Sequence, residues 1–225
     1  LIEDMLVASQ PLFVAGYSKT LKTLIALDMA ISLASGSDAL GWFKVPRACR
    51  VLYLSGEGGL PVLQEYSRRI AAHKGISLGS LGDIGLCDRV PRLGDQGHVE
   101  EIRRIIAAFR AECVFLDPLY LAIPPDQPGI VQAQGAYLAA FGSACLESGA
   151  TPIILHHTSK FSHILRTQSW EPPQLHDMAG AGVVEFAGRH GSASRDGRSA
   201  TENAFSCERL AFWRASVMSI RLPCR

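Results

Sequence analysis

The chain has 225 residues, a length that one hydrophobic core commonly spans, so two full domains are not expected. Hydrophobic residues make up 48% of the chain and charged residues 19%, which excludes a charge-rich disordered protein. The 22 basic and 21 acidic side chains leave a net charge of +1, so no field of the whole molecule would draw it onto nucleic acid or an anionic membrane.

Cysteine spacing and hydropathy indicate a cytoplasmic protein. The six cysteines form no C-x-x-C pair, which argues against a zinc ribbon or a redox motif and fits buried free thiols in a reducing cytosol. No apolar run reaches the roughly 18 residues of a membrane span, because Asp28 interrupts the longest candidate, so no membrane partner is expected. The start at Leu1 rather than Met fits a piece of a longer protein.

Strands and helices are predicted to alternate along the chain. Short apolar runs predict strands over residues 11–16, 50–55, 83–90, 112–116 and 151–156. Helical spacing of apolar residues predicts helices over residues 21–34, about 62–73, 99–110 and 131–148. Short, continuously apolar strands between helices indicate a parallel sheet that is covered on both faces. We therefore predict an α/β fold with three αβα layers and a mainly parallel sheet.

The first predicted strand leads into the most informative motif. Residues 16–23 read GYSKTLKT, which matches G-x-x-x-x-G-K-[ST] except at the second Gly, where Leu21 stands. Even without that Gly, the pattern is expected only roughly 0.05 times by chance in a chain of this composition. Backbone N–H groups of such a loop surround phosphate oxygens, while Lys22 would bridge the terminal phosphates and Thr23 would ligate Mg²⁺. The predicted phosphate-binding residues are Gly16, Tyr17, Ser18, Lys19, Thr20, Leu21, Lys22 and Thr23. An ordinary strand-to-helix turn with a solvated lysine is the alternative.

Two carboxylates follow other predicted strands. Asp117 ends an apolar run and would hold Mg²⁺ from a strand next to the phosphate-loop strand; the alternative is a strand-end Asp that caps a turn. Glu57 lies just past the strand RVLYLS and is a candidate general base for an attacking water. A solvated loop residue is the alternative for Glu57.

The last predicted strand ends in His156 and His157, and Lys160 follows. Adjacent strand residues point to opposite faces, so at most one of these histidines would face a nucleotide. Three of the five lysines, Lys19, Lys22 and Lys160, lie in loops that are expected to converge on one phosphate site.

The ordered set GYSKTLKT, VLYLSGEGG, ECVFLDPLYLAI and ILHHTSK resembles AAA-domain ATPases of RecA-like fold that are related to plasmid hexameric replicative helicases. The resemblance covers about residues 10–190. It implies a RecA-like P-loop sheet and ATP and Mg²⁺ binding by Gly16, Lys19, Lys22, Thr23 and Asp117. It further implies Glu57 as the catalytic carboxylate, and His156 or His157 with Lys160 as catalytic phosphate-sensing residues. Relatives form rings, so a homo-oligomer, by resemblance a hexamer, is implied, with a basic finger from the neighbour completing each site.

The sequence departs from that family in its last part. AGAGVVEFA at residues 179–187 still resembles it, but after Arg189 the pattern dissolves, as a frameshift or a fragment end would produce. We therefore expect an ATPase domain over residues 1–190, incomplete at its C-terminal end, and a divergent or disordered tail over 191–225. The family's arginine finger would then be missing, or replaced by Arg166 or Arg189.

The resemblance leaves the activity open between several classes. An ATPase that acts on single-stranded DNA in replication or on a mobile element is one hypothesis, although residues 118–133, expected near the ring channel, hold no Lys or Arg. A non-catalytic nucleotide-binding or assembly module, in effect a truncated pseudo-ATPase, is the alternative. A nucleoside or small-molecule kinase would need an arginine-bearing lid, which the sequence does not clearly show.

Overall fold

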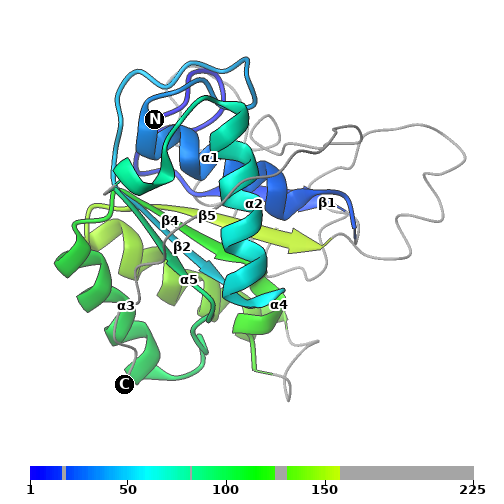
Figure 1. The fold of residues 1–225 in the computed structure, drawn as a ribbon. Coiled ribbons are helices and arrows are strands. Elements are labelled where there is room, and N and C mark those ends of the chain that lie inside the picture. Colours follow the sequence, from blue (N-terminus) through cyan, green and yellow to red (C-terminus); the bar gives the residue numbers. More distant parts are fainter. Residues whose placement is uncertain (17–18, 82, 125–130, 158–225) are drawn as a thin grey trace, which may run out of the picture.

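The structure is a computed structural model that describes residues 1–16, 19–81, 83–124 and 131–157 (Figure 1). In chain order the elements are β1 (Leu12–Gly16), α1 (Lys22–Ser35), β2 (Val51–Ser55), α2 (Gly59–His73), the 3₁₀ turn η1 (Leu78–Ser80), β3 (Ile84–Cys87), α3 (Gln96–Phe109), β4 (Cys113–Asp117), α4 (Leu119–Ala122), α5 (Val131–Glu147) and β5 (Thr151–His157). Every predicted strand and helix is present, whereas the two short elements η1 and α4 were not predicted. The predicted tail over 191–225 lies outside the described residues.

Two elements differ from their predicted lengths for local reasons. Helix α2 begins at Gly59, earlier than expected, because Pro61 occupies its first turn, where a missing N–H costs no helical hydrogen bond. Strand β3 is an edge strand that, within the described part of the chain, pairs with β2 alone. That pairing ends where Leu54 of β2 lies beside Cys87, so β3 ends at Cys87. It is therefore shorter than the predicted run of residues 83–90.

All five strands are parallel and follow the order β1-β5-β4-β2-β3. Strand β5, the last in the chain, lies between β1 and β4. The expectation that Asp117 lies on the strand next to the phosphate-loop strand is therefore wrong, because β5 separates the two. The order also joins distant parts of the chain, since Leu12 of β1 pairs with Ile153 of β5.

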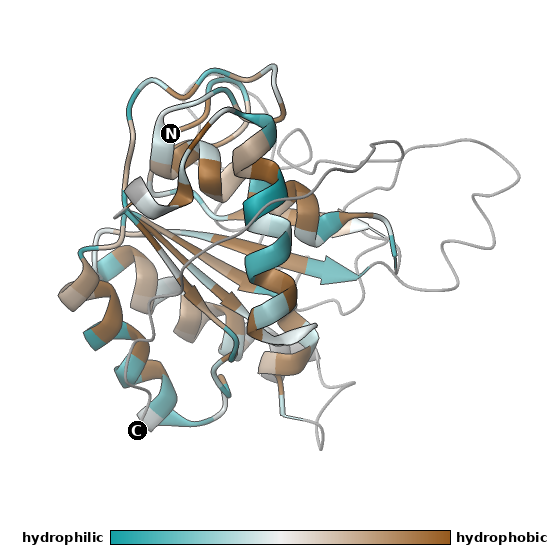
Figure 2. Cartoon of the chain, in the orientation of Figure 1, coloured by the Kyte–Doolittle hydropathy of each residue, from teal (hydrophilic) through white to brown (hydrophobic). Residues whose placement is uncertain are grey.

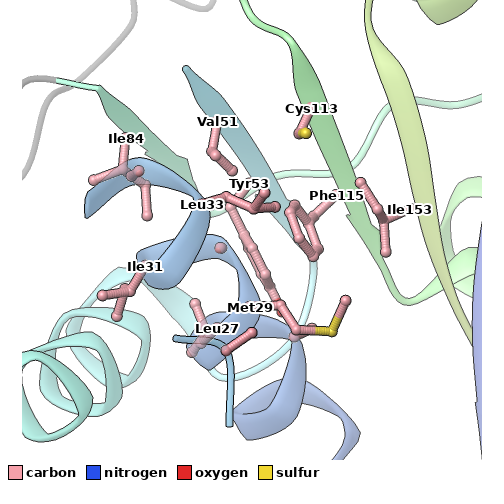
Figure 3. Close-up of a cluster of buried hydrophobic side chains, with 14 of the residues drawn as sticks. Leu27, Met29, Ile31, Leu33, Val51, Tyr53, Ile84, Cys113, Phe115 and Ile153 are labelled. Atoms are coloured by element: carbon pink, nitrogen blue, oxygen red, sulfur yellow. The ribbon is translucent and has the colours of Figure 1, made fainter. Parts of the chain in front are cut away.

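Helices cover both faces of the sheet, which confirms the predicted three-layer αβα fold (Figure 1). Helices α1 and α2 pack on one face, and α3 and α5 pack on the other. Figure 3 shows the first of these cores, in which Leu27 and Met29 of α1 lie against Tyr53 and Phe115 of the sheet. Alternate strand residues enter the second core, for example Leu52 of β2. Because both faces are buried, the strands are continuously apolar, which is why the sequence revealed them.

The carboxyl ends of the parallel strands meet at one edge of the sheet and carry polar residues there. The tip of β5 is hydrophilic in Figure 2, whereas the strand bodies are mainly hydrophobic. The register pairs Gly16 with His157 and Ser55 with Asp117. This edge is where ligands bind in open parallel sheets.

Four of the six cysteines lie within the described residues. Cys49, Cys113 and Cys145 are buried and Cys87 is half-buried, and none of these four cysteines forms a disulfide. Cys207 and Cys224 lie outside the described residues. In the part of the chain that the structure describes, no helix has the length and apolarity needed to cross a bilayer.

Candidate active site

Gly16 and Thr20 lie close to the Lys22 side chain. Lys22 is the first residue of α1 and is only 8% exposed, and its Nζ donates to Thr20 Oγ1 at 3.5 Å. A Cβ on Gly16 would lie 2.8 Å from Thr20 Oγ1 and 3.6 Å from the Lys22 stem, so a larger residue here would force the Thr20 side chain to shift. Lys19 is exposed, and Tyr17 and Ser18 lie outside the described residues.

Leu21 occupies the motif position that normally holds Gly, and its backbone explains that preference. Its φ of 62° and ψ of 13° lie in the left-handed region, where a residue with a Cβ is strained by about 1–2 kcal/mol. The Leu21 carbonyl accepts a hydrogen bond from Ile25 N at 3.0 Å, so Leu21 begins the helical ladder of α1. The leucine thus adopts the conformation that a glycine would adopt without strain.

Asp117 ends β4 as a buried carboxylate beside the start of α1. It is 2% exposed; the Tyr53 hydroxyl donates to its Oδ2 at 2.7 Å, and the Thr23 side chain also hydrogen-bonds to it. Burial raises the pKa of Asp117, while the hydrogen bonds from Tyr53 and Thr23 and the charge of Lys22 oppose this rise. Burial in turn lowers the pKa of Lys22, against the attraction of Asp117 and Glu57. The structure thus brings three predicted residues, Lys22, Thr23 and Asp117, into one partly desolvated cluster.

The donors in this cluster fit Mg²⁺ that is bound together with phosphate. Thr23 and Asp117 offer hard oxygen ligands from α1 and β4, and Mg²⁺ is commonly held by one or two protein oxygens with phosphates and waters. A cation beside the buried Asp117 carboxylate would offset the burial that raises its pKa. Within the described residues, no group of three or more His, Cys, Asp or Glu side chains could cage a metal alone.

Glu57 lies in the turn after β2, at the same edge of the sheet. The turn is fixed by Gly56 N, which donates to the Asp117 carbonyl at 2.8 Å. The Glu57 side chain is exposed, and the Tyr120 hydroxyl donates to its Oε1 at 2.6 Å. This hydrogen bond raises the pKa of Tyr120 to about 12. The carboxylate is therefore held at the edge of the sheet and exposed to solvent.

Of the two histidines that end β5, His157 is the one beside this cluster. Along β5, Ile153 and Leu155 face α1 and α2, and the alternation puts His157 on that side and His156 on the other. The His157 ring lies 5.4 Å from the Tyr120 ring, and burial together with the charge of Lys22 lowers the pKa of His157. The placement does not support a direct role for His156, which is 5% exposed on the α3–α5 side. Lys160 lies outside the described residues.

Sequence reasoning missed two tyrosines at this site. Tyr53 reads as an ordinary strand residue, and Tyr120 belongs to the unpredicted α4. A signal for Tyr53 existed, because it lies two residues before the end of β2 and so points to the same face as Ser55. That signal becomes specific only once β2 is known to pair with β4, which sets Ser55 opposite Asp117.

A family model described as an AAA domain matches residues 1–163, which is most of the chain. The chain belongs to this AAA-domain family. The AAA-domain module is therefore a nucleotide-binding module of the P-loop ATPase type, in agreement with its parallel α/β sheet. No curated protein matches the chain.

Proposed function

We propose that this AAA-domain protein binds ATP with Mg²⁺ and hydrolyses it. The observation that carries the proposal is the convergence of Lys22, Thr23 and Asp117 at the carboxyl edge of the sheet, with Glu57 on the neighbouring turn. A lysine and a helix N-terminus suit phosphate, and the oxygen pair suits the cation that accompanies it.

Each of these residues has a task in phosphoryl transfer to water. Lys22 balances the charge that develops on the terminal phosphate, and Thr23 and Asp117 hold the Mg²⁺, which neutralises phosphate charge when bound. Glu57 accepts a proton from the attacking water, and its solvent exposure lets water reach it. His157 lies on the same face and contributes a polar group that senses the γ-phosphate.

The finer proposal concerns assembly and substrate. We infer a homo-oligomeric ring, related to plasmid hexameric helicases, in which a basic residue of the neighbouring subunit completes each site. Its support is the resemblance of the four motifs, together with the exposure of Glu57 at the edge of the sheet. Single-stranded DNA is the proposed polymer substrate.

One observation favours a second candidate, a nucleotide-binding module without turnover. The proposed base Glu57 is already engaged, since Tyr120 donates to Oε1 at 2.6 Å. If this hydrogen bond persists with nucleotide bound, ATP would bind and remain intact.

The test compares Lys22→Ala with the parent chain. Mg²⁺-dependent phosphate release and ATP binding are measured with and without single-stranded DNA. Loss of the ammonium should lower turnover by at least about 100-fold and weaken ATP binding, because Lys22 is the lysine whose charge acts on the buried Asp117. Lys44→Ala is the matched control, since Lys44 lies on the surface in an ion pair with Asp38.

The outcomes separate the two candidates. Tight ATP binding by the parent without turnover, lost in Lys22→Ala, supports the non-catalytic module. Equal ATP binding by Lys22→Ala and the parent would refute both, because the loop would then not bind phosphate.

A further inference from the structure

Helix α4 contacts the turn after β2 through backbone, apolar and polar groups. The Gly56 N–H donates to the Asp117 carbonyl at 2.8 Å. The Leu121 side chain lies so close to Gly56 that a Cβ on this glycine would be 2.7 Å from Leu121 Cδ1. The Tyr120 hydroxyl donates to Glu57 Oε1 at 2.6 Å. The turn that carries the proposed base therefore packs directly against α4.

The Tyr120 side chain can move while α4 stays in place. Leu119 and Ala122 lie on one face of α4 and are both fully buried, whereas Tyr120 is 48% exposed. The two buried residues fix the helix in the core on the α3–α5 side of the sheet. Exposed side chains change rotamer rapidly, so the Tyr120 ring can turn away from Glu57 without unfolding the helix.

A ring contact holds the Tyr120 hydroxyl near Glu57. The centroids of the Tyr120 and His157 rings are 5.4 Å apart, and the ring planes are tilted by 55°, a usual geometry for aromatic pairs. Burial lowers the pKa of His157, the charge of Lys22 lowers it further, and the charge of Glu57 raises it. Tyr120 thus lies between two residues of the candidate site, one beside the Lys22 cluster and one that would activate water.

The Tyr120 hydroxyl acts on Glu57 as a hydrogen-bond donor that keeps its proton. The hydrogen bond to Glu57 and burial raise the pKa of Tyr120 to about 12, so the phenol is neutral at pH 7. A donated hydrogen bond stabilises the charged form of a carboxylate. It therefore opposes proton uptake, which is the step that a general base performs when water attacks phosphate.

We propose that Tyr120 is a positioning residue that restrains Glu57 by this hydrogen bond, and that its rotation away releases Glu57 to accept a proton from the attacking water. The inference rests on the proposed hydrolysis and adds a regulatory residue to that site. In the restrained state ATP binds and stays intact, and in the released state it is hydrolysed. One side chain thus determines which of the two candidate functions the domain performs.

The experiment measures kcat and KM for Mg²⁺-dependent ATP hydrolysis in the parent chain and in Tyr120→Phe. This substitution removes the hydroxyl and keeps the ring that contacts His157. Loss of a hydrogen bond to a charged group should raise kcat about fivefold or more. KM should stay unchanged, as should the ATP affinity measured by calorimetric titration, because the hydroxyl acts on the base Glu57.

Two further variants test whether the effect passes through Glu57. Tyr66→Phe is the matched control, because it removes a hydroxyl from a partly buried tyrosine of α2, and its kcat should equal that of the parent. In a Glu57→Gln background, Tyr120→Phe should give no gain in kcat, because the residue that it would release no longer accepts a proton. A purely structural effect of Tyr120→Phe would persist in that background.

Three results would overturn the proposal. Equal or lower kcat in Tyr120→Phe would show that the hydroxyl does not restrain the base. A gain that persists in the Glu57→Gln background would show that Tyr120 acts through another group. ATP binding without turnover in both the parent and Tyr120→Phe would show that release of Glu57 does not start hydrolysis. Failure of the proposed function itself is distinguishable, because it would appear as absent ATP binding in the parent alone.

Discussion

Asp117 and Lys22 are opposite charges that are each disfavoured by the same burial. Burial raises the pKa of Asp117 and lowers that of Lys22, so desolvation outweighs their mutual attraction in both cases. Such a pair is costly in the empty site and becomes useful when phosphate and a divalent cation arrive. Function at this edge of the sheet is therefore expected to reduce stability.

Asp117→Asn should raise the melting temperature of the nucleotide-free protein by a few degrees and abolish Mg²⁺-dependent turnover. The folded-state pKa of Asp117 lies above its unfolded value of about 3.8, so the fold binds this proton more tightly than the unfolded chain does. That contribution to stability is present at low pH and is lost as pH rises through the folded pKa. The higher melting temperature of Asp117→Asn should therefore be seen at pH 7 and should vanish near pH 3. Scanning calorimetry at both pH values measures it.

Asp38→Asn is the control for this prediction. Asp38 is a half-exposed carboxylate that pairs with the exposed Lys44, and surface pairs contribute little to stability. Its melting temperature should match that of the parent at pH 7. A lower melting temperature for Asp117→Asn at pH 7 would show that the hydrogen bonds from Tyr53 and Thr23 outweigh the cost of burial.

At the residue scale, the sequence predicts which residues belong to the candidate site. It does not predict which face of a strand each side chain points to. Lys22 and Thr23 could be named from the phosphate-loop motif. Asp117 and Glu57 could be named because they lie at or just past the end of an apolar run. His157 could not be preferred over His156, because a strand buried on both faces shows no alternation to reveal its orientation.

Capping explains where α3 begins. The Asp95 side chain accepts hydrogen bonds from Gly97 N at 2.8 Å and His98 N at 3.4 Å, so the helix starts at Gln96. The hydrophobic spacing alone predicted a start at residue 99, because the first turn contributes little to the core. Apolar periodicity thus predicts that a helix exists, and side-chain capping determines the residue at which it begins.

Asp95→Ala should lower the free energy of unfolding by about 1 kcal/mol, since two backbone donors lose their acceptor. Urea denaturation measures the loss. Asp95→Asn is the matched variant and should retain most of the stability, because its amide oxygen can still cap the helix. ATP affinity should be unchanged in both, since α3 covers the face of the sheet opposite to α1. An equal loss in Asp95→Asn would assign the effect to charge rather than to capping.

Very short helices are not predicted by hydrophobic patterns in the sequence. Helix α4 has four residues and follows Pro118, so it is too short for a helical period to appear. Its Tyr120 nevertheless contacts both Glu57 and His157. The missed element is therefore the one that connects two candidate site residues.

For the whole molecule, the alternation of strands and helices predicted the class of fold but not the order of strands. Local patterns specify elements, whereas the insertion of β5 between β1 and β4 depends on contacts across most of the chain. The family match extends beyond the described residues to residue 163. The boundary at residue 190 stays a prediction.

If the proposed ring completes each site, turnover per chain should fall steeply on dilution. Subunit association obeys mass action, so the loss should coincide with dissociation measured by light scattering. Mixing parent chains with an excess of Lys22→Ala chains should then change the activity of each parent chain, because neighbours share sites. Turnover per chain that is independent of both dilution and mixing would show that one subunit suffices.

The place of β5 also determines when the phosphate loop can form during synthesis. Among the described strands, β1 pairs with β5 alone, and Ser9 N donates to Thr151 Oγ1 at 2.9 Å just ahead of that pairing. A nascent chain that has emerged only as far as β4 therefore holds its first strand without a partner in the sheet. The motif leaves the ribosome before β5 does, and the proposed nucleotide site lacks the β5 side of its sheet until residue 157 has left the exit tunnel.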